Sequence, residues 1–450
     1  MASLAGKSLA GAAVALLYGT YLLGAPGAAQ AEVSFKGKTI DVMLGSPAGG
    51  GTDGTTRLVG SFLEKYLPGN PSMRYRNVPG GNGAKALNYF MKVKPDGLTW
   101  AGGSGAQVDP NSLRKSVVEY NPTKFHYFGG VQRGGSITFM RKDHLANLTD
   151  KSKPPVVVGV VDGDRSWEQL ILWGTEVLGW NTKFVMGYPG SAMMMLAIRR
   201  GETHMTATSN LFILKEMFAT GDFVGIAQLG SGASVGDDVE QRSEFSKIPT
   251  IHTLVQGKLR GLAAEAFDFW SALNDIDKWY ALPPGTSQDI VDAYRAAWDK
   301  MVKDPEFIKQ GKLLFSADFG PIGGSNVAEM VVKTAYPKAE IVNFMDQLKT
   351  KNGLPAEPLS EEELKALAKA RGLDKMEIPK IEVKLVKVGD AGRNIEFGVN
   401  GVTTKLDVSS SRTNINIGGK KGSRAELKPG AICTVEYIEG SSDANGITCP

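Results

Sequence analysis

Short apolar runs alternate with amphipathic segments along most of the chain. Residues 39–44 read as a buried strand, and residues 54–66 carry apolar side chains at close to a helical period. The alternation recurs between residues 73 and 101 and between residues 155 and 229. Near-continuous apolar strands separated by helices are typical of parallel sheets with helices on both faces. With a break around residues 120–140, the pattern predicts two α/β lobes.

The pattern changes in the last third of the chain. Residues 286–350 look mostly helical, and capping-box sequences begin at Thr286 and at Ser360. After Pro379, short strands separated by Gly-Asp, Asn-Gly and Gly-Gly-Lys-Lys-Gly turns predict a small β-barrel or sandwich. The expected strands are 381–388, 394–399, 403–408, 414–417 and 432–438.

The first 31 residues have the features of a secretory signal peptide. They carry one charged side chain, Lys7, then an apolar stretch from Leu9 to Leu23 and an Ala-Gln-Ala ending at Ala31. An uncleaved membrane anchor is the alternative. No other stretch is apolar and long enough to span a bilayer, so we expect a periplasmic protein that is soluble after cleavage near Ala31.

Composition excludes several classes of protein. With 42% hydrophobic and 22% charged residues, the chain is not disordered, and a net charge of +4 gives no reason to expect nucleic acid or stable membrane insertion. Two cysteines are too few for a disulfide scaffold. In an exported chain, Cys433 and Cys449 predict a single disulfide within the tail domain.

A glycine-rich loop, Ser46 to Gly54, follows the first strand and opens a helix. Its glycines let backbone N–H groups approach a ligand, and the helix N-terminus adds free donors, so the loop suits an anion. Gly49, Gly51 and Gly54 match G-x-G-x-x-G, but residues 70–80 contain no acidic residue to hold a ribose, which argues against a dinucleotide. A purely structural turn is the other reading.

Further motifs around this loop resemble a known family. The motif residues are Pro47, Gly50, Gly51, Asp53 and Arg57, then Asn77, Pro79, Gly80 and Gly83, and then Pro95, Asp96 and Gly97. Over roughly residues 36–350 the chain resembles the substrate-binding proteins of tripartite tricarboxylate transporters, the Bug-type periplasmic receptors. Later matches are Gly187-Tyr188, Ile248-Pro249-Thr250 and the run from Trp279 to Thr286.

The resemblance implies an α/β fold, a two-lobed periplasmic binding protein clamp, here with a small C-terminal all-β domain. Lobe 1 is expected from residues 36–132 and 230–350, and lobe 2 from residues 133–229. A helical linker, 351–379, would lead to the β domain, 380–450. Family ligands are mostly small carboxylates held between the lobes by loops at strand ends.

Carrying the family's loops onto this sequence gives a set of candidate ligand-binding residues. In the first lobe they are Ala48, Gly49, Gly50, Gly51, Thr52, Asp53, Gly103 and Ser104. In the second lobe they are Asp162, Asp164, Arg165, Ser166, Trp167, Tyr188, Ser191, Ser209 and Asn210. Because Gly50 belongs to the anion loop, we expect Gly50→Val to block the cleft.

The second-lobe loop 161–167 departs from the family pattern. Arg165 is suited to gripping an anion and Trp167 to stacking on a ring, while Asp162 or Asp164 is suited to accepting from a ligand amine or hydroxyl. Alternatively, Asp164 caps the next helix and Arg165 pairs with Glu168 on its solvent face.

These observations predict a receptor that catalyses no reaction, needs no cofactor or metal, and presents a small organic acid to a membrane transporter. A sensor that signals to a membrane partner, an exported enzyme with Asp162 or Asp164 as acid/base, and an interaction scaffold are the alternatives. No histidine has metal-ligand spacing, and no G-x-S-x-G elbow with supporting partners is present.

Overall fold

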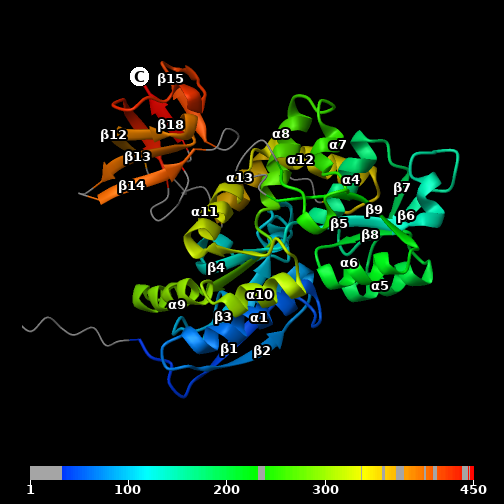
Figure 1. Cartoon of the computed structure of the whole chain (residues 1–450), viewed down its shortest axis with the longest axis horizontal. Coiled ribbons are helices and arrows are strands. Elements are labelled where there is room, and N and C mark those ends of the chain that lie inside the picture. Colours follow the sequence, from blue (N-terminus) through cyan, green and yellow to red (C-terminus); the bar gives the residue numbers. More distant parts are fainter. Residues whose placement is uncertain are drawn as a thin grey trace, which may run out of the picture. The chain divides into compact units, whose positions relative to one another are not determined.

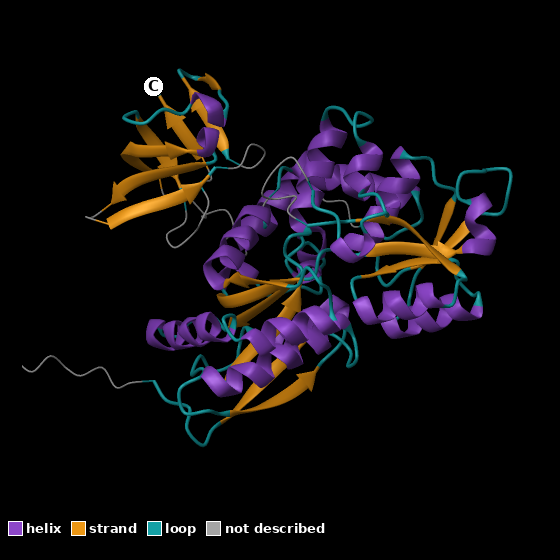
Figure 2. Ribbon diagram, viewed as in Figure 1, coloured by secondary structure: helices purple, strands orange, loops and turns teal. Residues whose placement is uncertain are grey.

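The computed structural model describes residues 33–231, 239–335, 337–356, 360–370, 380–399, 402–408, 413–437, 444 and 446–450. The predicted signal peptide, 1–31, lies outside these residues. Figure 1 labels the helices and strands, and Figure 2 distinguishes strands from helices by colour.

The first sheet has six strands in the order β11-β4-β10-β3-β1-β2. β1, β2 and β3 run parallel, whereas β10 lies antiparallel between β3 and β4, and β11 pairs antiparallel with β4. The strands are β1 (Thr39–Leu44), β2 (Ser72–Asn77), β3 (Thr99–Ser104), β4 (His126–Gln132), β10 (Lys278–Leu282) and β11 (Gly320–Gly323).

Helices cover both faces of this sheet, as its near-continuous apolar strands predict. On one face Ala101, Tyr127 and Trp279 pack in a buried cluster with α2 and α11. On the other, the rings of Trp100, Phe128 and Tyr280 contact one another and the aromatic residues of α9. The helices of this part are α1 (Gly51–Tyr66), α2 (Ala84–Phe90), α3 (Pro110–Leu113), α9 (Gln288–Met301), α10 (Pro305–Leu314) and α11 (Gly324–Thr334).

The second sheet has five strands in the order β7-β6-β8-β5-β9. β6 runs parallel to β7 and β8, and β5 lies antiparallel between β8 and β9. The strands are β5 (Ile137–Arg141), β6 (Val156–Gly159), β7 (Thr182–Val185), β8 (Met205–Thr208) and β9 (Phe223–Gln228). The helices packed in its core are α4 (Ser166–Val177), α5 (Ser191–Arg200), α6 (Leu211–Ala219), α7 (Ile251–Val255), α8 (Leu262–Leu273) and α12 (Ala339–Lys351).

The sequence predicts that residues 230–350 belong wholly to the first lobe. The core packing instead places part of this range with the second sheet. Ile251 of α7, Trp270 of α8 and Met345 of α12 belong to the same buried cluster as the second sheet. The amphipathic pattern shows that a helix has a buried face but not which sheet covers that face. The chain passes from the first sheet to the second between β4 and β5, and returns through α7 and α8 to β10.

The C-terminal strands form one open seven-stranded sheet in the order β14-β13-β12-β17-β18-β15-β16. The barrel alternative is therefore wrong, since the edge strands β14 and β16 do not pair with each other in the described residues. β16 and β18 are absent from the predicted strands. The strands are β12 (Lys380–Gly389), β13 (Asn394–Val399), β14 (Val402–Asp407), β15 (Asn414–Ile417), β16 (Lys420–Lys421), β17 (Ile432–Glu436) and β18 (Gly446–Cys449).

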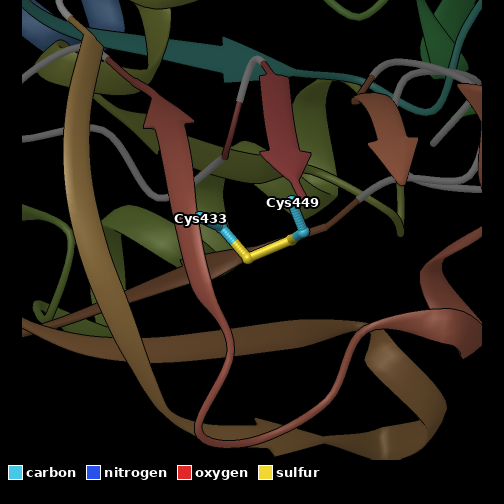
Figure 3. The surroundings of a disulfide bond; sticks show 2 residues. All are labelled: Cys433 and Cys449. Atoms are coloured by element: carbon cyan, nitrogen blue, oxygen red, sulfur yellow. A yellow bond between two sulfur atoms is a disulfide. The ribbon is translucent and has the colours of Figure 1, made fainter. Parts of the chain in front are cut away.

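The predicted disulfide joins two neighbouring strands of this sheet. Cys433 on β17 is bonded to Cys449 at the end of β18, and both side chains are buried in the domain's own apolar cluster (Figure 3). The bond thus fixes the last strand of the chain to the middle of the sheet.

Helix starts follow the local sequence closely. In the predicted linker, α13 (Glu361–Ala370) begins with a capping box in which Ser360 and Glu363 bond reciprocally. α9 begins one residue later than its sequence suggests, with Ser287 rather than Thr286 as the N-cap.

Among the helices that the structure describes, none combines the length and the apolar character needed to cross a bilayer.

Candidate functional site

A cavity of about 120 Å³ is lined by segments from both sheets. It lies where Ser104 follows β3, Asp164 follows β6 and Ser209 follows β8, at the carboxyl ends of strands that run parallel to a neighbour. This is where open α/β sheets bind ligands. The volume is sufficient for about ten water molecules, which is the size range of a small organic acid.

Four described helices of nine residues or more begin at the cavity. Gly51 opens α1, Ser166 opens α4 and Ser191 opens α5, while Asn210 is the N-cap of α6, and all four residues line the cavity. The first N–H groups of a helix have no partner within that helix, and its N-terminus carries a partial positive charge. Their convergence makes the cavity favourable for a negative charge.

A basic cluster adds full charges to the same cavity. The guanidinium of Arg133 donates from Nε and Nη2 to the carboxylate of Asp277 at 2.5 and 2.9 Å, and from Nη1 to Oδ1 of Asn210 at 3.1 Å. The ammonium of Lys278 bonds the same carboxylate at 2.5 Å. Two cations thus share one anion, which leaves a net positive charge at the cavity wall.

Burial changes how these groups titrate. It is the main cause that lowers the pKa of Lys278 to about 8, with Arg133 lowering it further and Asp277 offsetting part of the change. Burial alone would raise the pKa of Asp277, but Arg133 and Lys278 together hold it well below its usual range. Asp277 therefore stays ionised, while Lys278 loses its proton at a mildly alkaline pH.

Asp164 is fully buried and held by two lysines from other segments. Its carboxylate is paired with Lys115, which follows α3, and with Lys349 on α12 at 2.5 Å. Burial would raise the pKa of Asp164, but the two ammonium groups lower it. An acid held ionised in this way is poorly suited to donating a proton.

Arg165 extends from the second-lobe loop toward the first lobe. Its Nη2 donates to Oδ1 of Asn82 at 3.3 Å, and Arg165 itself is the N-cap residue of α4. Both capping alternatives considered for this loop are therefore wrong: Asp164 is not the N-cap, and Glu168 is buried. The Glu168 carboxylate accepts backbone N–H groups of Val161, Gly163 and Arg165 at 2.5, 2.7 and 3.1 Å, which fixes the loop.

The structure brings many of the predicted ligand-binding residues to the cavity. Those that line it are Gly51, Thr52, Ser104, Asp164, Arg165, Ser166, Trp167, Ser191, Ser209 and Asn210. Those outside its lining are Ala48, Gly49, Gly50, Asp53, Gly103, Asp162 and Tyr188.

The first-lobe residues outside the lining have structural roles. Asp53 accepts the N–H of Gly49 at 2.9 Å and pairs with Arg57, so its carboxylate closes the glycine loop. Gly103 lies in β3 against the ring of Trp279, where a side chain does not fit. Gly50 lies outside the lining, and a Cβ there would come no closer to its surroundings than 3.7 Å from Pro47, so the effect of Gly50→Val on the cavity stays a prediction.

The two second-lobe residues also bond locally. Asp162 accepts the backbone N–H of Asp164 at 3.1 Å, and the ring of Tyr188 packs over Gly159. These two side chains therefore support loops of the cavity without lining it themselves.

Sequence reasoning missed much of the lining. The missed residues are Gly105, Ala106, Asp109, Arg133, Gly135, Ser136, Ala207, Thr208, Leu229, Trp270, Leu273, Asn274, Ile276, Asp277 and Lys278. One available signal was a charged pair, Asp277 and Lys278, directly before an apolar strand. Another was Arg133 before Gly134 and Gly135, whose φ angles of 73° and 80° are both positive.

Three further atoms of the lining are buried without a hydrogen-bond or ion-pair partner in the described part of the chain. They are Nε1 of Trp270 and Nε of Arg165, which are donors, and Oδ1 of Asn274, an acceptor. The Nδ2 of Asn274 donates to the carbonyl of Trp270 at 3.2 Å, which fixes the amide. Within the same described residues, no group of three or more His, Cys, Asp or Glu side chains is placed to hold a metal ion.

Comparison with protein-family models gives no match, and neither does comparison with curated proteins. Solved structures do match. A Rhodopseudomonas palustris protein, Rpa4515 with adipate, is 20% identical, covers 71% of this chain and 98% of its own, and has a TM-score of 0.53. MatC from the same organism, with bound malate, is 16% identical, covers 70% of this chain and 100% of its own, and has a TM-score of 0.50.

A third match is the periplasmic binding protein BugD, which is 16% identical, covers 75% of this chain and 98% of its own, and has a TM-score of 0.49. The first two matches establish the fold predicted from the motifs of the first lobe. The chain has the two-lobed α/β fold of periplasmic binding proteins, with an additional C-terminal β-sheet domain.

Proposed function

We propose that this protein is a periplasmic receptor that binds a small organic carboxylate between its lobes and delivers it to a tripartite tricarboxylate-type membrane transporter. The observation that carries the proposal is the cavity where four helix N-termini meet Arg133 and Lys278. Such a cavity stabilises a carboxylate through N–H groups and through charge. The adipate and malate complexes of proteins with this fold support the same ligand class.

The enzyme alternative has less support. Asp164 is buried between two lysines and held ionised, and Asp162 bonds to its own loop outside the lining. Asp162 is therefore not placed to exchange a proton with a molecule in the cavity, and Asp164 is poorly suited to donating one. A receptor that signals to a membrane partner binds its ligand in the same way. The sensor alternative therefore differs only in which membrane protein the ligand-bound receptor contacts.

Isothermal titration of the full mature chain tests the ligand class. The probes are butanoate, succinate, malate and adipate, titrated at pH 7.5, with ethyl butanoate as an uncharged control. We expect saturable one-to-one binding by at least one acid, in the micromolar range, equivalent to about −8 kcal/mol. An absence of binding by every acid, or equal binding by the ester, would overturn the proposal.

Delivery of the bound acid to a membrane transporter needs a second measurement. Uptake of the bound acid by cells that lack the receptor gene should fall and be restored by the wild-type chain. Normal uptake together with loss of a transcriptional response to the acid would favour the sensor.

A further inference from the structure

The cavity has an acidic part that a simple carboxylate does not use. Asp109 lines the cavity and is 5% exposed. It accepts the backbone N–H and the side-chain amide of Asn111 at 2.8 and 3.1 Å, and both bonds end on Oδ1. No lysine or arginine in the described part of the chain forms an ion pair with this carboxylate. A buried carboxylate is ordinarily paired with a cation.

The surrounding charges leave Asp109 without a cation of its own. Burial is the main cause that raises its pKa to about 6, and the negative charge of Asp164 adds to the rise. Lys349 offsets part of it, but the ammonium of Lys349 donates to Asp164 at 2.5 Å. A positive group placed in the cavity would relieve the cost of burying this charge.

The basic and acidic groups belong to different neighbourhoods of the one cavity. Arg133 and Lys278 are both bonded to Asp277, whereas Asp109 is bonded to Asn111. A ligand with two opposite charges would satisfy both.

Capping of α3 explains why position 109 holds an Asp-type residue. It does not explain why that residue carries a negative charge in the cavity. Asp109 is the N-cap of α3 and precedes a proline at the first helical position. Asp304 caps α10 with the same chemistry, accepting the N–H of Glu306 at 2.9 Å before Pro305, far from the cavity lining. Asparagine caps a helix as well as aspartate does, so capping alone does not require the charge at Asp109.

We propose that the cavity binds an amino-carboxylate, with its carboxylate beside Arg133 and Lys278 and its ammonium group beside Asp109. This proposal rests on the proposed function, because it names the ligand class for the same cavity.

The test compares acids of one chain length that differ in a single group. Butanoate, succinate, 2-aminobutanoate and 4-aminobutanoate are titrated into the full mature chain at pH 7.5, where Asp109 is ionised. We expect one of the two amino acids to bind at least tenfold more tightly than butanoate and succinate. The two amino acids cover two spacings of the charges.

Two variants with matched capping chemistry identify the residue. Asp109→Asn keeps an N-cap and removes the charge, so it should abolish most of the tenfold preference for the amino acid over butanoate. Asp304→Asn makes the same change at the other cap and should preserve the preference.

The possible outcomes separate this proposal from the one on which it rests. Binding of succinate or butanoate without any preference for an amino acid overturns the amino-carboxylate proposal alone. A preference that survives in Asp109→Asn also overturns it, because another group must then read the amine. No binding by any of the acids overturns the proposed function as well.

Discussion

At the scale of single residues, the charge at the cavity depends on a few side chains that hold one another. Arg133 and Lys278 are both fixed on Asp277, and Arg133 also bonds Asn210 of the other sheet's loops. Buried charge-assisted bonds of this kind keep cations in place without a ligand. The cavity is thus arranged for an anion in advance, which lowers the entropic cost of binding.

Gly51 is the position where a small change should disturb that arrangement. A Cβ at Gly51 would lie 2.5 Å from Nη1 of Arg133 and 3.4 Å from Oδ1 of Asn210. In Gly51→Ala the guanidinium must move from its bonds, so we expect succinate to bind about tenfold more weakly, corresponding to the loss of one charged hydrogen bond. Calorimetric titration measures the change.

The neighbouring glycine provides the control. Gly50 has an ordinary φ of −81°, and an added Cβ meets only Pro47, at 3.7 Å. Gly50→Ala should therefore bind succinate within about twofold of wild type. Equal loss in both variants would contradict a specific role for Gly51.

Lys278 should make anion binding sensitive to alkaline pH. Its pKa is lowered to about 8, and a bound carboxylate favours the protonated form, so affinity should be constant below pH 8. Above pH 8 the free protein loses this charge, and succinate affinity should fall by up to about tenfold per pH unit. Titrations between pH 6.5 and 9.5 measure this.

The variant Lys278→Met separates this lysine from other groups that titrate. It should bind succinate more weakly at pH 7 and lose the decline above pH 8. A decline that persists in Lys278→Met would assign the effect to another residue.

At the scale of secondary-structure elements, the cavity depends on where helices begin. One of these helices, α1, packs with the first sheet, and the other three, α4, α5 and α6, pack with the second. The cavity lining nevertheless includes the first residues of α1, α4 and α5 and the N-cap of α6. Each helix follows a strand, so its N-terminus lies at that strand's carboxyl end. The strand–helix alternation therefore predicts donors at the site before any loop is examined.

The disulfide concerns other elements, two strands of the C-terminal sheet. It closes a loop of 16 residues between β17 and β18, and the chain-entropy estimate for such a loop is about 3 kcal/mol. Replacing Cys433 and Cys449 together by serine should lower the unfolding free energy of the C-terminal domain by about that amount. Hydrogen exchange of the β17 and β18 amides measures the loss.

Succinate binding provides the control for the disulfide variant, because none of the described residues of the C-terminal domain lines the cavity. Affinity in the double variant should equal that of wild type. Unchanged exchange of the strand amides would show that the disulfide does not stabilise these strands.

At the scale of the whole molecule, the described clusters of buried apolar residues keep the C-terminal sheet apart from the rest. The cluster of the second sheet extends to Leu354, whereas that of the C-terminal sheet begins at Val383. Separate cores are typical of domains that fold independently. The ligand cavity belongs wholly to the part that precedes residue 279.

A chain that ends after Pro379 should therefore bind succinate with a dissociation constant within about twofold of the full chain. If cells with the shortened chain lose uptake while binding persists, the C-terminal domain serves the contact with the membrane partner. Loss of binding on truncation would contradict the separation of the cores.

The sequence by itself determined the elements and part of the site. The two α/β blocks, the C-terminal strands and the disulfide follow from local periodicity, turn residues and cysteine count, because these depend on neighbours in the chain. The glycine loop was found for the same reason, because it follows a strand and opens a helix, whereas Ser104, Arg165, Ser191 and Asn210 came from the resemblance to the family's loops. The structure confirms the fold class expected from the motifs.

Only the tertiary structure decided what lies opposite these loops. Asp109 and Lys278 are far apart in sequence, and no local pattern shows that both border one cavity. The sequence also does not show which sheet packs against α7, α8 and α12, because an amphipathic helix can pack on either lobe. Conversely, Asp53 looked like a ligand-binding residue until its carboxylate was seen to close its own loop. Long-range packing sets these relations, and packing depends on the whole chain at once.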